Sequence, residues 1–310
     1  MADDRSNAVL VTGGRGFIGR AVTFLLQRLG YDVVSVDTTP YDSVRTHDQE
    51  SGQKILCDIS NREELLHAFE AERIGGIIHL AAILPTAAQR DPLRATQVNV
   101  VGSLNLLELA RRFGVRRFVF GSSLSVYGIW PADRIVSEQD RAAPEDIYGA
   151  AKLYVEQMGK VFSDRDGLEF VSLRIGRVVG AGAQSASSAW RSHVFEHLDA
   201  TSPVDISLPY APSERILAVH VDDVARMLVT VVQAARAKYT IYNAHCESIV
   251  VADLKREVER LNSNITVSLG GESVVGNPRL LDCSRFAGEF AFQTLPIFER
   301  LKTAAARGKD

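Results

Sequence analysis

The first half of the chain alternates between two patterns of hydrophobic and polar residues. Short runs that are almost wholly apolar are typical of β-strands buried on both faces, and apolar residues three and four positions apart are typical of helices. Because the two patterns alternate, the sequence predicts an α/β fold built on a doubly wound parallel sheet. The strand-like runs cover residues 9–11, 32–37, 54–57, 76–82, 117–120 and 170–175, and the helix-like segments cover 21–29, 61–72, about twenty residues after Pro92, and 148–161.

The pattern loosens after Val178, where residues 180–215 become rich in Ala, Ser, Gly and Pro. We expect residues 1–178, with contributions from about 215–245, to form the sheet domain, and residues 179–310 to form most of a smaller C-terminal lobe. In this half we expect helices over 190–198, from Asp222 to Ala234, over 251–261 and from Pro296, and strands over 219–224, 239–243 and 265–269. Two helix starts carry capping signals: Ser60 with Glu63, and Asp222.

A glycine-rich turn joins the first strand to the first helix. Its residues are Thr12-Gly13-Gly14-Arg15-Gly16-Phe17-Ile18-Gly19, and Asp37 ends the next strand. Gly13 permits a sharp turn, Gly16 lets the backbone approach a pyrophosphate at the helix N-terminus, and Gly19 lets helix and strand pack closely. Asp37 is placed to accept hydrogen bonds from a ribose hydroxyl and would repel a 2′-phosphate, which favours NAD over NADP, although Arg15 could soften that preference. The turn therefore predicts a Rossmann domain that binds NAD through Gly13 and residues 16–19.

Composition and charge narrow the class of protein. Hydrophobic residues make up 46% and charged residues 24% of the chain, as in globular enzymes, and the net charge of −3 disfavours nucleic acid and acidic membranes as partners. The three cysteines (Cys57, Cys246 and Cys283) have no metal-ligand spacing, and we predict no metal site. With no signal peptide and no membrane-spanning run in the sequence, we expect a cytoplasmic protein with reduced cysteines.

A tyrosine and a lysine one helical turn apart supply candidate catalytic chemistry. Tyr148 and Lys152 share a helix face, and a lysine ammonium would lower the pKa of the phenol. The pair could then exchange a proton with an alcohol during hydride transfer to NAD⁺. Ser123, at the end of a neighbouring strand, could hold the reacting oxygen. These features predict an oxidoreductase.

These motifs together resemble the extended short-chain dehydrogenase/reductases, in the NAD-dependent epimerase/dehydratase branch. The similarity extends from residue 9 to about residue 300. Besides the glycine turn and the Tyr148–Lys152 pair, it rests on residues 57–59, 79–82, 99–108, 122–128, 173–176, 219–225 and 281–286.

The resemblance implies roles for individual residues. Tyr148 would be the general acid/base, Lys152 would lower its pKa and hold the nicotinamide ribose, and Ser123 would bind the reacting oxygen. Asn99 would support the active-site helix, and the family often forms homodimers through the helices that carry Asn99 and Tyr148. The remaining cofactor contacts would come from Asp58 and Ile59 at the adenine, and from Leu80, Ala81 and Ala82 beside the ribose and pyrophosphate.

The substrate part of the sequence departs from relatives that act on nucleotide sugars. Those relatives usually carry an asparagine where this chain has Arg177, and often an Arg-Asp-Phe run that is absent from residues 207–218. Arg177, Arg191 and Arg215 could bind a carboxylate or phosphate, although each could equally be a surface arginine or part of an internal salt bridge. Ser125 is a further candidate for substrate contact.

Three functions stay open from the sequence. The first is a net dehydrogenase of a free sugar, sugar acid or related polyol, and the Arg177 departure favours it. The alternative is a nucleotide-sugar epimerase with tightly bound NAD; a dehydratase is disfavoured because Leu124 and Ser125 provide no acid. An inactive NAD-binding regulatory protein is the third, and the intact Ser123, Tyr148 and Lys152 argue against it.

Overall fold

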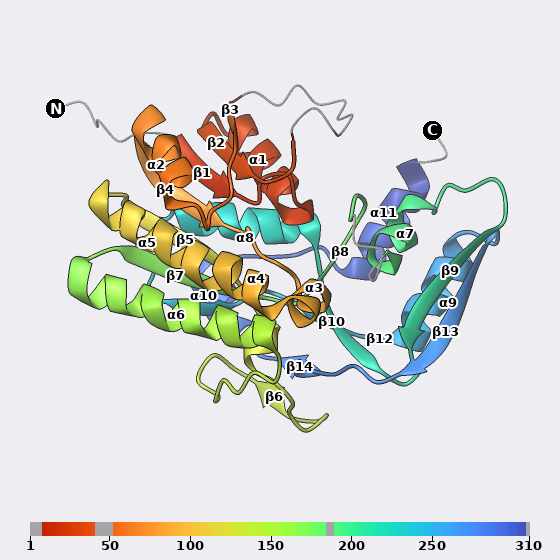
Figure 1. Cartoon of the computed structure of the whole chain (residues 1–310). Helices are drawn as coiled ribbons and strands as arrows, with labels where there is room; N and C mark the ends of the chain where they lie inside the picture. Colours follow the sequence, from red (N-terminus) through yellow and green to blue (C-terminus); the bar gives the residue numbers. More distant parts are fainter. Residues whose placement is uncertain (1–7, 41–51, 184–188, 308–310) are drawn as a thin grey trace.

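The structure is a computed structural model that describes residues 8–40, 52–183 and 189–307. It confirms the predicted fold class: seven parallel strands form one sheet in the order β11-β7-β5-β4-β1-β2-β3 (Figure 1). The sheet strands are β1 (Ala8–Thr12), β2 (Asp32–Asp37), β3 (Gln53–Leu56), β4 (Ile74–His79), β5 (Arg117–Ser123), β7 (Glu169–Ile175) and β11 (Ile241–Asn243).

Helices cover both faces of this sheet, which is why its strands are apolar on both sides. One face packs against α1 (Phe17–Arg28) and α8 (Val221–Gln233), which contribute Val22, Leu26 and Leu228 to a common core. The other face packs against α2 (Arg62–Ala71), α5 (Ser103–Arg112) and α6 (Ile147–Asp166). Two short helices, α3 (Pro85–Arg90) and α4 (Pro92–Thr96), follow β4.

The smaller lobe has its own core and lies beyond the sheet (Figure 1). β9 (Val204–Tyr210) and β13 (Ile265–Glu272) pair in parallel, and β10 (Arg215–His220) lies between β8 (Arg177–Val179) and β12 (Glu247–Val250). β8 starts two residues after β7 ends, so the chain passes directly from the carboxyl end of β7 into this lobe. The other elements after β5 are β6 (Ile135–Val136), α7 (Trp190–Glu196), α9 (Val251–Leu261), β14 (Leu280–Leu281), α10 (Ser284–Phe290) and α11 (Ile297–Arg307).

Both predicted helix caps are wrong by one or two residues. Asn61 caps α2, because its side chain accepts hydrogen bonds from two first-turn N–H groups, while the Ser60 hydroxyl donates to Asp58 instead. His220 caps α8, because β10 ends there and leaves Asp222 inside the first turn. Local sequence offered several capping side chains side by side, and the strand ends selected among them.

The long helix expected after Pro92 is interrupted. α4 passes into a π-helical turn over Gln97–Gly102 before α5 begins. A Cβ on Gly102 would lie 2.6 Å from the Ile59 side chain, so this widened turn brings the helix close to the loop after β3. Such turns often occur at functional sites, and this one carries Asn99. Among the described helices, none is long and apolar enough to cross a membrane.

Candidate active site

The glycine turn has the geometry that a dinucleotide pyrophosphate requires. Gly13 has a positive φ of 69°, and a Cβ on Gly19 would lie 2.0 Å from the Gly13 carbonyl oxygen. Gly16 caps α1 without a side-chain hydrogen bond, and the first turn of α1 contains no acidic residue. The first-turn N–H groups and the helix dipole can therefore face an anion. The sequence analysis gave no role to Gly14, where a Cβ would lie 2.0 Å from the Ser35 hydroxyl.

Asp37 lies at the carboxyl end of β2, beside this turn. Its carboxylate accepts hydrogen bonds from the backbone N–H groups of Arg15 (3.0 Å) and Thr39 (2.9 Å). These bonds fix the carboxylate next to the turn, as recognition of a ribose hydroxyl requires. The predicted preference for NAD over NADP at this position stays a prediction.

A buried hydrogen-bond chain supports the wall formed by residues 80–82. The Ser103 hydroxyl donates to the Asn99 carbonyl (2.7 Å), so His79 Nε2, 2.8 Å away, must donate to Ser103. Burial and the charge of Lys152 hold the pKa of His79 well below its usual range, so the ring is neutral and its Nδ1 accepts from the Thr12 hydroxyl (2.7 Å). The Thr12 oxygen in turn accepts the N–H groups of Leu80 and Ala81. The sequence analysis did not assign this role to His79.

Asp58 and Ile59, expected at the adenine, and Asn99, expected to support the active-site helix, already have protein contacts. Asp58 accepts bonds from Ser60 and pairs with Arg94, and although burial opposes ionisation, these hydrogen bonds lower the pKa of its carboxyl. Ile59 is buried in the core. Asn99 exchanges two hydrogen bonds with the backbone of Ile83 (2.7 and 2.9 Å) and so fixes the loop after β4. Their predicted contacts with the cofactor stay predictions.

The first two turns of α6 hold the candidate acid/base. Asp146 caps the helix by accepting the Gly149 N–H (2.6 Å), which sets where Tyr148 and Lys152 face. Lys152 is 3% exposed, and its ammonium donates to the Gly121 carbonyl oxygen of β5 (2.7 Å). The same nitrogen lies 4.6 Å from the Phe120 ring centroid and 5.5 Å from that of Tyr148. Tyr148 and Lys152 therefore meet at the carboxyl end of β5.

The effect that the sequence predicts for Lys152 on the pKa of Tyr148 stays a prediction, because other groups set this pKa in the structure. Burial raises the pKa of Tyr148 to about 12, and the charge of Asp146 also raises it. The groups that lower this pKa are Ser123, through a hydrogen bond, and Arg191, through its charge. Burial lowers the pKa of Lys152 itself to about 7, which leaves this lysine only partly charged near neutrality.

Glu156 lies one helical turn after Lys152 on the same face of α6. No sequence motif pointed to a role for it. It is buried, and Arg174 of β7 donates two hydrogen bonds to it (2.6 and 3.0 Å). The Ser172 hydroxyl donates to the same carboxylate (3.0 Å). The charge of Glu156 opposes the lowering of the Lys152 pKa. The spacing of Tyr148, Lys152 and Glu156 was visible in the sequence, but the partner strand was not.

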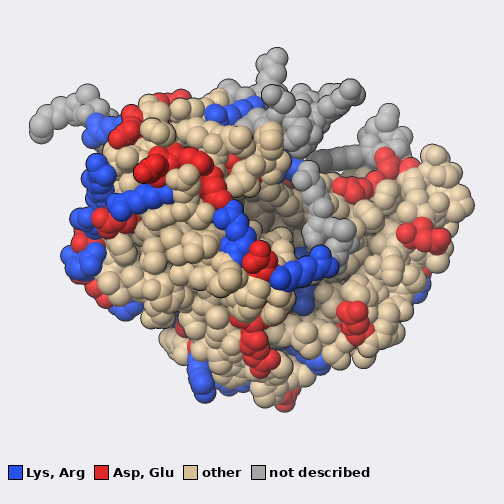
Figure 2. Space-filling view, in the orientation of Figure 1, with Lys and Arg blue, Asp and Glu red and all other residues tan. Residues whose placement is uncertain are grey.

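Ser123 and Ser125 lie at the end of β5, next to Tyr148. The Ser123 hydroxyl donates to the Ser125 hydroxyl (3.1 Å) and accepts the Ser125 N–H (3.1 Å). The structure thus brings Ser123, Tyr148 and Lys152 to one strand end, as the sequence analysis expected of a catalytic set. In the space-filling view the surface is hollowed between the sheet domain and the smaller lobe (Figure 2).

Two of the three candidate arginines lie on this side of the smaller lobe. Arg177 Nε donates to the Tyr210 hydroxyl (3.3 Å). Burial and the charge of Arg177 lower the pKa of Arg191, and the charge of Arg191 lowers the pKa of Tyr148. Arg215 is exposed at the start of β10, three residues before Ala218, which pairs with Arg177. It therefore lies about 10 Å further along the strand. Tyr210 carries no motif that sequence reasoning could have used.

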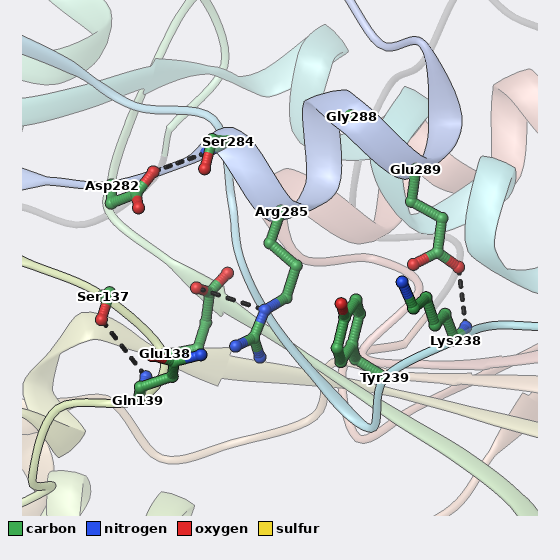
Figure 3. A pocket seen from close by; sticks show the side chains of 10 residues that line it. All are labelled: Ser137, Glu138, Gln139, Lys238, Tyr239, Asp282, Ser284, Arg285, Gly288 and Glu289. Carbon is green, nitrogen blue, oxygen red and sulfur yellow. Dashed lines mark hydrogen bonds and ion pairs between the residues drawn. The ribbon is translucent and has the colours of Figure 1, made fainter.

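Two other candidate sites lie apart from Tyr148. A pocket of about 460 Å³ is bordered by α10 and the segments around residues 137–139 and 238–239 (Figure 3). Its charged groups have protein partners: Arg285 binds the Ile241 carbonyl and Glu138, and Glu289 accepts from Lys238 and Tyr242. One possible metal-ligand group occurs among the described residues: His193, Glu196 and His197, at the end of α7, place ligand atoms within 4.8 Å of one another.

Comparison with known proteins identifies the class. The sequence pattern of the NAD dependent epimerase/dehydratase family matches residues 9–244, and the chain belongs to this family. It is 27% identical to the mitochondrial L-threonine 3-dehydrogenase of Sus scrofa over 86% of this chain and 71% of that protein. It is 34% identical to the UDP-glucose 4-epimerase of Lacticaseibacillus casei over 56% of this chain, and the match spans about half of that protein (52%).

The solved structures agree with this assignment. The UDP-glucose 4-epimerase of Thermus thermophilus in complex with NAD superimposes with a TM-score of 0.81 at 24% identity, covering 97% of this chain and 99% of that one. The resemblance inferred from the motifs is therefore confirmed, and so is NAD as the cofactor. The protein belongs to a family of NAD-dependent epimerases and dehydrogenases.

Proposed function

We propose that this protein is a net NAD-dependent dehydrogenase of a small hydroxyl compound, a sugar acid or related polyol, with Tyr148 as its acid/base. The observation that carries the proposal is the convergence of Ser123, Tyr148 and Lys152 at the carboxyl end of β5, the edge where ligands of doubly wound sheets bind. A half-buried phenol beside a hydroxyl and a lysine is suited to exchange a proton with an alcohol.

Each residue has a distinct task in this proposal. The Ser123 hydroxyl orients the substrate oxygen toward Tyr148. The Tyr148 phenolate takes the proton of the alcohol O–H bond while the C–H bond of the same carbon breaks and releases hydride. Lys152 exchanges protons readily near neutrality because its pKa is about 7. Residues 16–19 and Asp37 would hold NAD, which would supply the hydride acceptor. The positive charges near the phenol, Arg191 among them, favour the phenolate that the reaction needs.

The alignments support a small substrate over a nucleotide sugar. The match to the threonine dehydrogenase covers 86% of this chain and so reaches the smaller lobe, whereas the match to the UDP-glucose epimerase covers 56%. Arg177 also occupies the place of the asparagine that contacts nucleotide sugars in many relatives. The higher identity to the epimerase, 34%, keeps a nucleotide-sugar epimerase with tightly bound NAD as the second candidate.

The deciding experiment is absorbance at 340 nm while the purified enzyme with added NAD⁺ is offered sugars, sugar acids, small hydroxy acids and nucleotide sugars. A steady rise with a small hydroxyl compound supports the net dehydrogenase. No rise, with a changed sugar product by chromatography, means that hydride returns to the substrate and the epimerase candidate is correct. Tyr148→Phe should bind NAD normally and lose nearly all turnover; more than a few per cent residual activity would rule out the acid/base role.

The proposal also covers assembly and location. We propose a homodimer that forms through α5 and α6, where Tyr154 and Val161 are exposed, and a cytoplasmic enzyme with no nucleic-acid or membrane partner. Lys and Arg are interspersed with Asp and Glu on the visible face, without a large patch of one sign (Figure 2). Sedimentation of the purified protein tests the dimer.

A further inference from the structure

Two guanidinium groups lie close together in the smaller lobe without an acidic partner. Arg177 begins β8 and Arg191 lies in the first turn of α7, and these elements are joined where the Gly180 N–H donates to the Arg191 carbonyl (3.0 Å). Across the described residues, neither side chain forms a salt bridge, unlike the buried Arg174. This excludes the internal salt bridge that the sequence left open for them within that part of the chain.

One donor of this pair has no partner. Arg191 Nε is buried and makes no hydrogen bond within the described chain. Burial and the neighbouring charge of Arg177 both lower the pKa of Arg191, while Tyr210 and Tyr148 raise it. An unsatisfied buried donor is costly, and two like charges repel, so the arrangement by itself is unfavourable. An anion placed between the two guanidinium groups would relieve both costs.

An aromatic pair fixes the position of these arginines. The Tyr210 hydroxyl accepts from Arg177 Nε (3.3 Å), and its ring lies edge-on to Trp190 at 6.1 Å. The Arg177 guanidinium carbon lies 5.5 Å from the Tyr210 ring centroid, and that of Arg191 lies 5.9 Å from the Trp190 ring. Rings that contact both guanidinium groups limit their rotation. A planar two-oxygen group matches the guanidinium fork.

We propose that Arg177 and Arg191 form an oxyanion subsite that binds a charged group of the substrate, a carboxylate or a phosphate ester, beside the carbon that is oxidised. The statement that the bound anion belongs to the substrate and lies beside the oxidised carbon rests on the proposed function. The subsite lies next to the acid/base because β5 and β7 pair Ser123 with Ile175, and Arg177 follows Ile175 by only two residues. The charge of Arg191 also lowers the pKa of Tyr148. A substrate would therefore carry its anionic group close to the reacting hydroxyl, as a small hydroxy acid does.

Binding without turnover tests the subsite. NAD-loaded enzyme is titrated by calorimetry, at constant ionic strength, with acetate, its neutral counterpart acetamide, and inorganic phosphate. We expect saturable binding of acetate or phosphate and none of acetamide. Arg191→Gln and Arg177→Gln should each lower the affinity for the anion by about 10-fold or more, because each variant loses a charge-assisted hydrogen bond. Arg256→Gln is the matched control, because Arg256 is exposed on α9 of the same lobe, and it should leave binding unchanged.

The outcomes separate the subsite from the proposed function. Acetate binding that the two variants weaken supports a carboxylate substrate, and phosphate binding without acetate binding supports a phosphate ester. Equal binding of acetamide, no saturable binding, or anion binding that neither variant weakens overturns the subsite. Should Tyr148→Phe leave turnover intact while anion binding depends on both arginines, the proposed function fails and the subsite stands. If an uncharged polyol is turned over as fast as the corresponding acid, the proposed function stands and the subsite fails.

Discussion

The buried Lys152 makes a quantitative prediction about stability. Its pKa falls from 10.5 to about 7 because burial disfavours the ammonium. The folded protein therefore loses this proton at a much lower pH than the unfolded chain. The difference of about 3.5 pKa units, at 1.36 kcal/mol for each, corresponds to about 5 kcal/mol of folding free energy. Replacement by Met, which cannot be protonated, removes this dependence.

The sign of the effect follows from which state binds the proton. Below pH 7 the lysine is protonated in both states, and the folded state carries the full cost of the buried charge. Between pH 7 and 10.5 the unfolded chain holds more protons, so the free energy of unfolding rises with pH relative to Lys152→Met. In the middle of this window the gain is about 1.4 kcal/mol for each pH unit.

Urea denaturation at pH 7, 8, 9 and 10, without added NAD, measures this difference. We expect the stability of wild type minus that of Lys152→Met to increase by about 3 to 4 kcal/mol from pH 7 to 10. Lys160→Met is the control, because Lys160 is exposed on the same helix and pairs with Asp164 at its surface. A constant difference between wild type and Lys152→Met across this range would refute the reasoning from burial.

Three further perturbations test separate parts of the site. Asp37→Asn should lower the ratio of kcat/KM for NAD to that for NADP by about 10-fold, since it removes the charge that repels a 2′-phosphate; an unchanged ratio would contradict the placement of the ribose. Gly19→Ala should abolish NAD binding measured by calorimetry, because its Cβ would lie 2.0 Å from the Gly13 oxygen, while Gly288→Ala, with nothing within 4 Å, should not. Glu156→Gln should cost about 3–5 kcal/mol in urea denaturation by leaving Arg174 buried with a weakened partner; a loss below about 1 kcal/mol would mean that this pair adds little.

The sheet was predictable because the strands that form it are buried on both faces. A strand such as β1 or β5 must be nearly continuous in apolar residues, and that pattern is local in sequence. The glycine turn was predictable for a similar reason, since the sharp turn at Gly13 and the close packing at Gly19 each require glycine. Helix caps were predicted less accurately, because neighbouring residues such as Ser60 and Asn61 can both cap and the preceding strand decides between them.

The electrostatics of the site could not be predicted because they depend on contacts between distant segments. The pair of Tyr148 and Lys152 is visible at helical spacing, yet the pKa of each depends on how deeply β5 and the smaller lobe bury it. Arg191 lies on a separate helix of the smaller lobe, and no local pattern connects it to Tyr148. The sequence therefore predicts the candidate catalytic groups, but the burial that raises the pKa of Tyr148 comes from the folded structure.

A buried lysine and an arginine donor without a partner are both unfavourable for folding, and both lie around Tyr148. The buried ammonium of Lys152 lowers the free energy of unfolding at neutral pH. Arg191 Nε makes no hydrogen bond and lies near the positive charge of Arg177. The buried Arg174, by contrast, is paired with Glu156. Because a folded protein keeps such costs mainly where a ligand relieves them, the position of Lys152 and Arg191 beside one phenol supports the view that substrate binding completes the electrostatics of this site.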